Sequence, residues 1–130
     1  VLNAGTYYIR VFSVDNTDTN YQLSVVAGAS SNDLAGNTLA TALNIGSLNA
    51  SGRYHDSVGG ADSNDYYRLS LNYAGSIALS LNSLSGSNAD LQLLNSSGSV
   101  LQTSGHSGST LDWINRTLTP GIYYVRVNAG

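Results

Sequence analysis

Hydrophobic and polar residues alternate along several short stretches of this chain. The stretch DYYRLSL, residues 65–71, places Tyr67, Leu69 and Leu71 on one face and polar or amphipathic residues on the other. The stretch GSIALSL, residues 75–81, repeats this alternation. A period of two residues is typical of a β-strand with one buried face. We therefore predict strands over both stretches.

Six further stretches are predicted as strands from the same kind of pattern. Turn sequences such as NSSG, SGHSGS and TPG separate many of them, so that turns recur about every 8–12 residues. This spacing predicts an all-β fold, either a sandwich or a barrel. The stretch TLATAL, residues 38–43, fits a helical turn or a short strand, and its pattern leaves both open. The six additional predicted strands are residues 6–12, 21–26, 89–94, 99–103, 111–118 and 122–127.

The composition strengthens the all-β prediction and limits the partners. Neither Glu nor Lys occurs, and Ser, Asn, Gly and Thr, which favour turns and strands over helices, are abundant. A net charge of -3 gives no electrostatic reason to bind nucleic acid. No apolar run approaches the roughly 20 residues that span a bilayer, so we expect no membrane insertion. Cysteine is absent, and the low-charge composition fits a secreted or surface protein.

A repeat links the two ends of the chain. GTYYIRV occupies residues 5–11 and GIYYVRV occupies residues 121–127. The two copies are separated by roughly a hundred residues, the size of one whole domain, so the chain resembles slightly more than one period of a tandem array. Between them, AGASSNDLAGN, residues 27–37, is small, polar and without periodicity, which predicts a linker.

Four segments in succession resemble a known family. NTLATALNIG, DSNDYYRLSL, GSIALSLNSLSGSNADLQLLNSSGSVL and LDWINRTLTPGIYYVRV are together similar to the bacterial pre-peptidase C-terminal domain, whose fold resembles the collagen-binding domains of clostridial collagenases. The resemblance covers residues 30–130. It implies an extracellular, jelly-roll-like antiparallel β-sandwich without catalytic activity, carried by secreted bacterial enzymes or arranged in series along surface proteins.

The resemblance also divides the chain. Residues 1–26 resemble the terminal β-hairpin of a preceding copy, residues 27–37 the linker, and residues 38–130 a sandwich that lacks its last strand. In the first hairpin Tyr21, Leu23 and Val25 supply an apolar face, and no equivalent follows in the sequence.

Two arrangements would supply the lacking strand. The 21–26 strand folds back onto its own sandwich, or it inserts into a neighbouring copy. Folding back makes the duplicated stretches 6–12 and 122–127 compete for one position. We therefore expect head-to-tail strand complementation that builds a fibre or a tandem surface array. The alternative is a collagen- or polysaccharide-binding accessory domain of a secreted hydrolase, and a third is an appendage for secretion.

Calcium is the one cofactor that the resemblance implies. In the collagen-binding relatives the ion lies between the linker and the loop before the DYY strand. The matching positions are Asn32, Asp33, Asp62 and Asp65. The acidic residues that precede the Asn-Asp pair in those relatives are replaced here, which weakens the expected affinity. The alternative is that these residues only cap turns.

The remaining polar and aromatic residues give no prediction of catalysis. No G-x-S-x-G sequence is present, and we expect His55 and His106 to lie on the surface without a catalytic role. We therefore predict that this chain is not an enzyme.

Tyrosine and arginine side chains form the candidate binding surface. If alternate residues of the two repeated strands face inward, an outward face is left that contains Tyr8, Arg10, Tyr124 and Arg126. Such a face suits stacking on a sugar or a peptide. The alternative is that cross-strand Tyr–Arg pairs simply cover the sheet.

Overall fold

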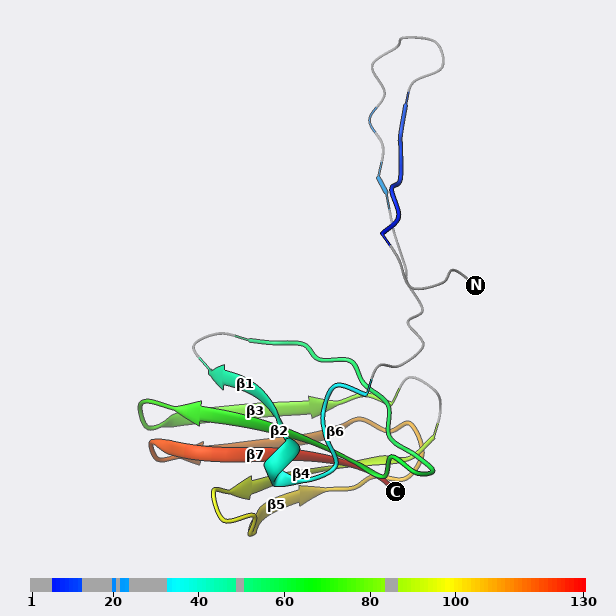
Figure 1. The fold of residues 1–130 in the computed structure, drawn as a ribbon. Coiled ribbons are helices and arrows are strands. Elements are labelled where there is room, and N and C mark those ends of the chain that lie inside the picture. The colour runs from blue at the N-terminus through cyan, green and yellow to red at the C-terminus, as the bar shows by residue number, and fades with distance from the viewer. Residues whose placement is uncertain (1–5, 13–19, 21, 24–32, 49–50, 84–86) are drawn as a thin grey trace.

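The computed structural model describes residues 6–12, 20, 22–23, 33–48, 51–83 and 87–130 (Figure 1). Within these residues a single turn of 3-10 helix, η1 (Leu39–Thr41), precedes seven strands. The strands are β1 (Leu43–Ser47), β2 (Asn64–Leu71), β3 (Gly75–Leu81), β4 (Ala89–Asn95), β5 (Val100–Ser104), β6 (Asp112–Leu118) and β7 (Gly121–Ala129). The strands predicted from residue 65 onward are confirmed to within a few residues at either end.

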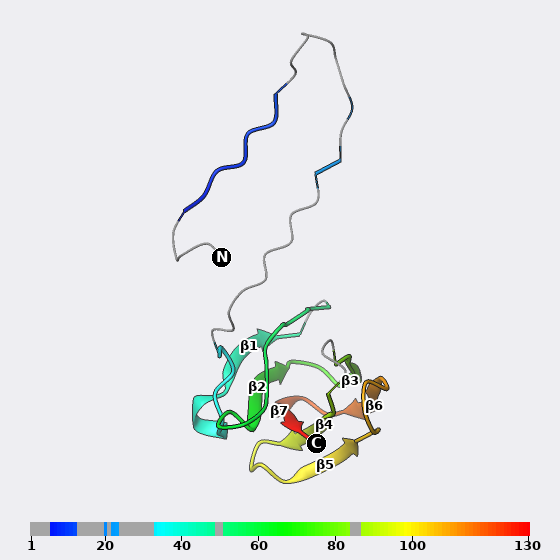
Figure 2. The same ribbon diagram turned by 90° about the vertical axis from the view of Figure 1, so that its right-hand side faces the viewer.

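The strands form two layers (Figures 1 and 2). One layer is a five-stranded sheet in the order β1-β2-β7-β4-β5, and the other is the two-stranded sheet β3-β6. All pairs are antiparallel except β1 with β2, which is parallel. The predicted all-β sandwich is therefore confirmed.

The core lies between the two sheets, where the alternating apolar faces meet. On β2 and β7 the predicted inward residues Tyr67, Leu69, Tyr123 and Val125 are buried. Full burial of one aliphatic side chain contributes roughly 1.5–3 kcal/mol. The hydrophobic effect on these alternating positions therefore fixes which face of each strand points inward. The residues that are completely shielded from solvent are Ala35, Leu69, Leu93 and Ile114.

The stretch that the pattern left open, residues 38–43, contains a helical turn and ends on the first residue of a strand. Thr38 caps η1: its side chain and that of Thr41 form a reciprocal capping box. Strand β1 then follows, and the sequence pattern predicted no strand beyond its first residue. Its pairing with β2 shifts register between Asn44 and Gly46, and Gly46 has a φ of 77°. This irregularity breaks the two-residue period on which recognition from sequence depends.

The N-terminal segment differs from its prediction. Residues 6–12 belong to no strand in the structure, and the proposed partner strand 21–26 lies mostly outside the described residues. All ten described residues between positions 6 and 23 are exposed. Figures 1 and 2 place them away from the sandwich.

No helix within the described ranges has the length and apolar character needed to cross a bilayer.

Candidate functional site

Three of the four predicted metal ligands converge at one end of the sandwich. Carboxylate oxygens of Asp33, Asp62 and Asp65 all lie within 4.8 Å of one another. Asp65 is buried on the inner face of β2, Asp62 lies in the loop before that strand, and Asp33 lies in the linker. Asn32, the fourth predicted ligand, lies outside the described residues.

Backbone contacts fasten the linker against β2 and so bring these carboxylates together. The amide of Tyr66 donates to the carbonyl of Gly36 at 3.1 Å, and the amide of Asn64 donates to Asn37 Oδ1 at 3.1 Å. The loop is closed by the amide of Asp62, which donates to the carbonyl of Gly59 at 2.9 Å.

Asp56 is a part of this arrangement that the predicted ligand set omitted. Its Oδ2 accepts hydrogen bonds from the amides of Leu34 and Ala35, both at 3.0 Å. Asp56 thereby connects the linker to the segment before β2. No local sequence signal marks this role, because the two groups are more than twenty residues apart and meet only in the fold.

Asp33, Asp62 and Asp65 together form an acidic cluster, and no ion pair compensates its negative charge in the described part of the chain. Burial raises the pKa of Asp65 to about 7, and repulsion from Asp56, Asp62 and Asp33 adds to the rise. The pKa of Asp33 is also raised, by desolvation and then by the neighbouring carboxylates. Asp62 Oδ1 and Asp65 Oδ1 are both buried, and neither has a hydrogen-bond partner among the described residues.

This set of groups fits a hard divalent cation. Calcium prefers several oxygen ligands that flexible loops can supply, and a cation would compensate the repulsion among the three carboxylates. No Arg side chain is ion-paired to the cluster in the described part of the chain. Asp33, Asp62 and Asp65 are thus the residues that would hold such an ion.

A second feature is an open groove along β3, with a volume of about 1110 Å³. One wall is residues 76–83, which include most of β3, and another is residues 51–58. Its floor is the inner face of the five-stranded sheet, where Leu69, Leu91 and Val125 line it. The groove thus exposes the apolar interior of the sandwich.

Neither wall of this groove is paired with a strand on its groove side among the described residues. Strand β3 pairs only with β6, so its groove-side edge has no strand partner among the described residues. Residues 51–58 form no strand. An unpaired edge beside an apolar face is a site that accepts a further strand.

The outer face of the five-stranded sheet carries the predicted tyrosine and arginine residues. In the register of β2 with β7, Tyr66 lies opposite Arg126 and Arg68 lies opposite Tyr124. All four are half-buried, so they cover the sheet surface. The cross-strand alternative therefore describes their placement better than free exposure does.

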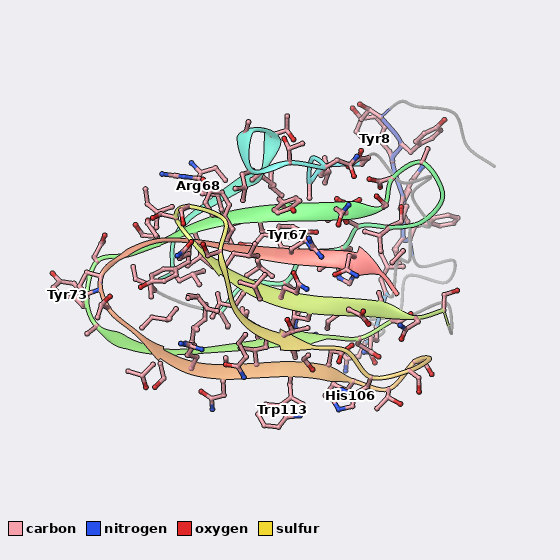
Figure 3. All side chains as sticks on the ribbon, turned by 90° about the horizontal axis from the view of Figure 1, so that it is seen from below. Tyr8, Tyr67, Arg68, Tyr73, His106 and Trp113 are labelled. Carbon is pink, nitrogen blue, oxygen red and sulfur yellow. The ribbon has the colours of Figure 1, made fainter. Side chains whose placement is uncertain are left out.

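The corresponding residues near the N-terminus are fully accessible. Tyr8 is 92% exposed (Figure 3). The guanidinium carbon of Arg10 lies 5.1 Å from the centre of the Phe12 ring. Leu23 is exposed, whereas Tyr21 and Val25 lie outside the described residues. The predicted interface residues therefore lie in two separate places, on the outer face of the five-stranded sheet and in the exposed N-terminal segment.

A serine, a histidine and an aspartate do meet in the structure, but not as a catalytic relay. Ser104 Oγ, His106 Nδ1 and the His106 amide all approach one atom, Asp112 Oδ1, at 2.8, 2.8 and 2.9 Å. A nucleophile relay requires the histidine to stand between serine and aspartate. Here both side chains instead bind a single buried oxygen. These hydrogen bonds stabilise the loop between β5 and β6. His106 lies at the surface, as predicted (Figure 3).

Comparison with known proteins agrees with this architecture. The family described as the bacterial pre-peptidase C-terminal domain matches residues 63–129, slightly more than half of the chain. The chain belongs to this family. The match runs from the loop before β2 to the end of β7, so the pre-peptidase C-terminal domain includes Asp65 and the β3 wall of the groove.

A solved structure supports the same fold for this domain. The chain is similar to the pre-peptidase C-terminal domain of a collagenase from Bacillus anthracis, with a TM-score of 0.58 and 22% identity. The similarity covers 68% of this chain and 82% of that one. No curated protein sequence matches the chain.

Proposed function

We propose that this pre-peptidase C-terminal domain is a non-catalytic extracellular structural module that assembles head-to-tail with further copies of itself by strand complementation. One observation carries the proposal: the apolar interior is open along an unpaired strand edge, the groove beside β3. The setting would be the surface or the surroundings of a bacterial cell.

The exposed N-terminal segment supports this proposal from the other side. Tyr8, Ile9, Phe12 and Leu23 are each more than half exposed, at 92%, 62%, 65% and 54%. Covering the apolar side chains of this segment with another surface stabilises the assembly by roughly 25 cal/mol per Å² of apolar area removed from water. The same chain therefore presents an apolar segment and an apolar groove.

The repeat argues against filling the groove from within one chain. Residues 5–11 nearly repeat the first seven residues of β7, which begins at residue 121. In the sheet, β7 already pairs with β2 on one side and with β4 on the other. The position of β7 in this sandwich is therefore already occupied, so the β7-like segment cannot take it.

Sedimentation velocity over a range of concentrations tests the proposal, with electron microscopy of the same samples. We expect the chain to form concentration-dependent oligomers or filaments. Leu23→Asp should reduce assembly strongly, because it places a charge on the apolar face of the segment. Gln22→Asp is the matched control on the opposite face and should assemble normally. A monodisperse monomer at every concentration would disprove the proposal.

A second function is favoured by the similarity to a domain of a collagenase. In this alternative the chain is a collagen- or polysaccharide-binding accessory domain of a secreted hydrolase. The Tyr and Arg residues of the outer sheet face would supply stacking and hydrogen bonds. Pull-down with a triple-helical peptide and with insoluble polysaccharides tests it. Tyr124→Ala and Arg126→Ala should weaken any retention, and Thr103→Ala, on the exposed β5 edge, should not.

We also propose that the acidic cluster binds calcium. The proposal is supported by the closeness of Asp33, Asp62 and Asp65 and by the buried oxygens without partners. The ion would neutralise the cluster and fasten the linker to β2. Its role would be structural, since it would lie where the linker meets the sandwich.

A further inference from the structure

We propose that the groove beside β3 is the acceptor site, and that its occupant is a strand centred on Leu23 of a second copy of this chain. The inference rests on the proposed function and specifies its contact. The donor strand, residues 21–26, would add to the free edge of β3, with Leu23 pointing into the groove.

The shape of the groove suits a strand. Its volume of about 1110 Å³ exceeds the roughly 300–1,000 Å³ of pockets that hold small ligands. Strand β3 has seven residues, which at about 3.3 Å per residue span roughly 23 Å. A six-residue donor spans roughly 20 Å by the same rise and fits along this edge.

The side chains of β3 define what the donor must present. Ile77, Leu79 and Leu81 face inward, while Ser76, Ala78 and Ser80 are exposed. Neighbouring strands share this alternation, so a donor needs apolar residues at every second position and tolerates polar ones between them. In YQLSVV, residues 21–26, Tyr, Leu and Val occupy one face, and the other face begins with Gln and Ser.

The lining of the groove shows how incomplete the core is at this point. Eight apolar residues that pack against the core remain only partly buried, and six of these eight line the groove. A donor strand would cover these side chains and remove their apolar surface from water. They are Ile45, Leu48, Leu71, Leu79, Leu81 and Val127.

The opposite side of the sandwich is already fastened. Arg116 on β6 donates a 2.7 Å hydrogen bond to the carbonyl of Leu101 on β5. The amide of Trp113 donates to Ser104 Oγ at 3.2 Å across the same two strands. These contacts connect the two sheets where β5 and β6 meet.

The free edges of the five-stranded sheet are less suited to pairing. Strands β1 and β5 have five residues each. Both carry a register irregularity, which shortens the regular ladder that an added strand could continue. The edge of β3 therefore remains the favoured place for an added strand.

The repeat indicates which segment is the donor. Residues 21–26 follow a copy of the β7 sequence, so they are the segment that comes after β7 in this repeating unit. The described part of that segment, Gln22 and Leu23, is exposed and in no strand. These two residues can therefore pair with a second copy without leaving a strand of their own chain.

Disulfide trapping in the 130-residue chain tests the contact, because its sequence contains no cysteine. One chain carries Gln22→Cys and a second, isotope-labelled chain carries Ser76→Cys, Ala78→Cys or Ser80→Cys. All four positions are exposed, so the substitutions leave the core intact. Thr103→Cys, on the exposed edge of β5, is the matched control.

We expect a mixed disulfide between the two chains at one of the three β3 positions. It should form on the order of tenfold faster than with Thr103→Cys, since pairing raises the local concentration of the thiols. Leu23→Asp added to the donor should remove this advantage.

Three outcomes would overturn the inference. Assembly with equal trapping at Thr103→Cys would place the contact elsewhere and leave the proposed function intact. In dilute solution, the double variant Gln22→Cys/Ala78→Cys would show an intramolecular disulfide if the donor came from the same chain. The absence of any assembly would overturn the proposed function together with the acceptor site.

Discussion

Ser104 donates a 2.8 Å hydrogen bond to the buried carboxylate of Asp112, across the loop that joins β5 to β6. The same oxygen accepts hydrogen bonds from the ring and the amide of His106. The loop is therefore organised around one side chain that is 1% exposed. Ser104, His106 and Asp112 are the residue types of a hydrolytic triad, and in this arrangement they stabilise the loop.

Replacing Asp112 with Ala should destabilise the domain by about 1–3 kcal/mol. The substitution leaves Ser104 Oγ and the His106 amide without their acceptor in a partly buried site. Urea denaturation followed by tryptophan fluorescence measures the loss, because Trp113 adjoins the site. His106→Ala keeps the backbone bond and should cost less. Equal stability of Asp112→Ala and the parent chain would contradict this account.

Asp112 should also make the domain sensitive to acid. Burial opposes its ionisation, but hydrogen bonds from Ser104 and His106 outweigh burial and hold its pKa below the usual value. A carboxyl group with a lowered pKa in the folded state contributes stability above its unfolded pKa, near 4, and loses it as the pH falls through the folded pKa. We expect the Asp112→Ala variant to lose less stability than the parent chain between pH 5 and strongly acidic conditions, roughly pH 2.

Asp65 should change the stability with pH in the opposite direction to Asp112. Its pKa is raised to about 7, so the folded state binds more protons than the unfolded state between about pH 4 and pH 7. Without divalent cations, this group therefore lowers the stability as the pH rises through that window. Asp65→Asn should flatten the dependence and unfold at a higher temperature than the parent chain at pH 8. A parallel pH profile in both chains would refute the assignment.

Calcium should reverse this loss of stability at neutral pH. Binding requires ionised carboxylates and releases protons, so its affinity should increase as the pH rises toward 7. Isothermal titration with millimolar calcium should give measurable heat and a higher melting temperature. Asp62→Ala should abolish both effects, whereas Asp90→Ala, on β4 outside the cluster, is the control. No heat and no shift in the parent chain would remove the metal proposal.

Adding a single methyl group at Gly98, in the turn between β4 and β5, should lower the stability of the domain. Gly98 has a φ of 84°, and an added Cβ would lie 2.7 Å from Leu39 Cδ1. Gly98→Ala should therefore destabilise the domain by about 1–2 kcal/mol. Gly75→Ala is the matched control, because it has no positive φ and no atom within 4 Å of the added Cβ. Chemical denaturation should separate the two variants clearly.

The sequence by itself determined the strands β2 to β7 and, on β2, β3 and β7, the faces that they bury. Alternation at Tyr67 and Leu69, for example, is a local pattern whose burial follows from the hydrophobic effect alone. The NSSG turn could also be predicted from its residues, and the amide of Asn95 donates to the carbonyl of Ser99 there at 2.9 Å. Each of these features depends only on residues that are close together in the chain.

Tertiary structure decided the features that depend on the path of the chain. The parallel strand β1, the hydrogen bonds from the amides of Leu34 and Ala35 to Asp56, and the groove beside β3 join segments that are far apart in sequence. The sequence named Asp33, Asp62 and Asp65 only through a family resemblance. Their convergence follows from the path of the chain, and the pKa of Asp65 is raised because its carboxyl group is buried and lies beside other carboxylates.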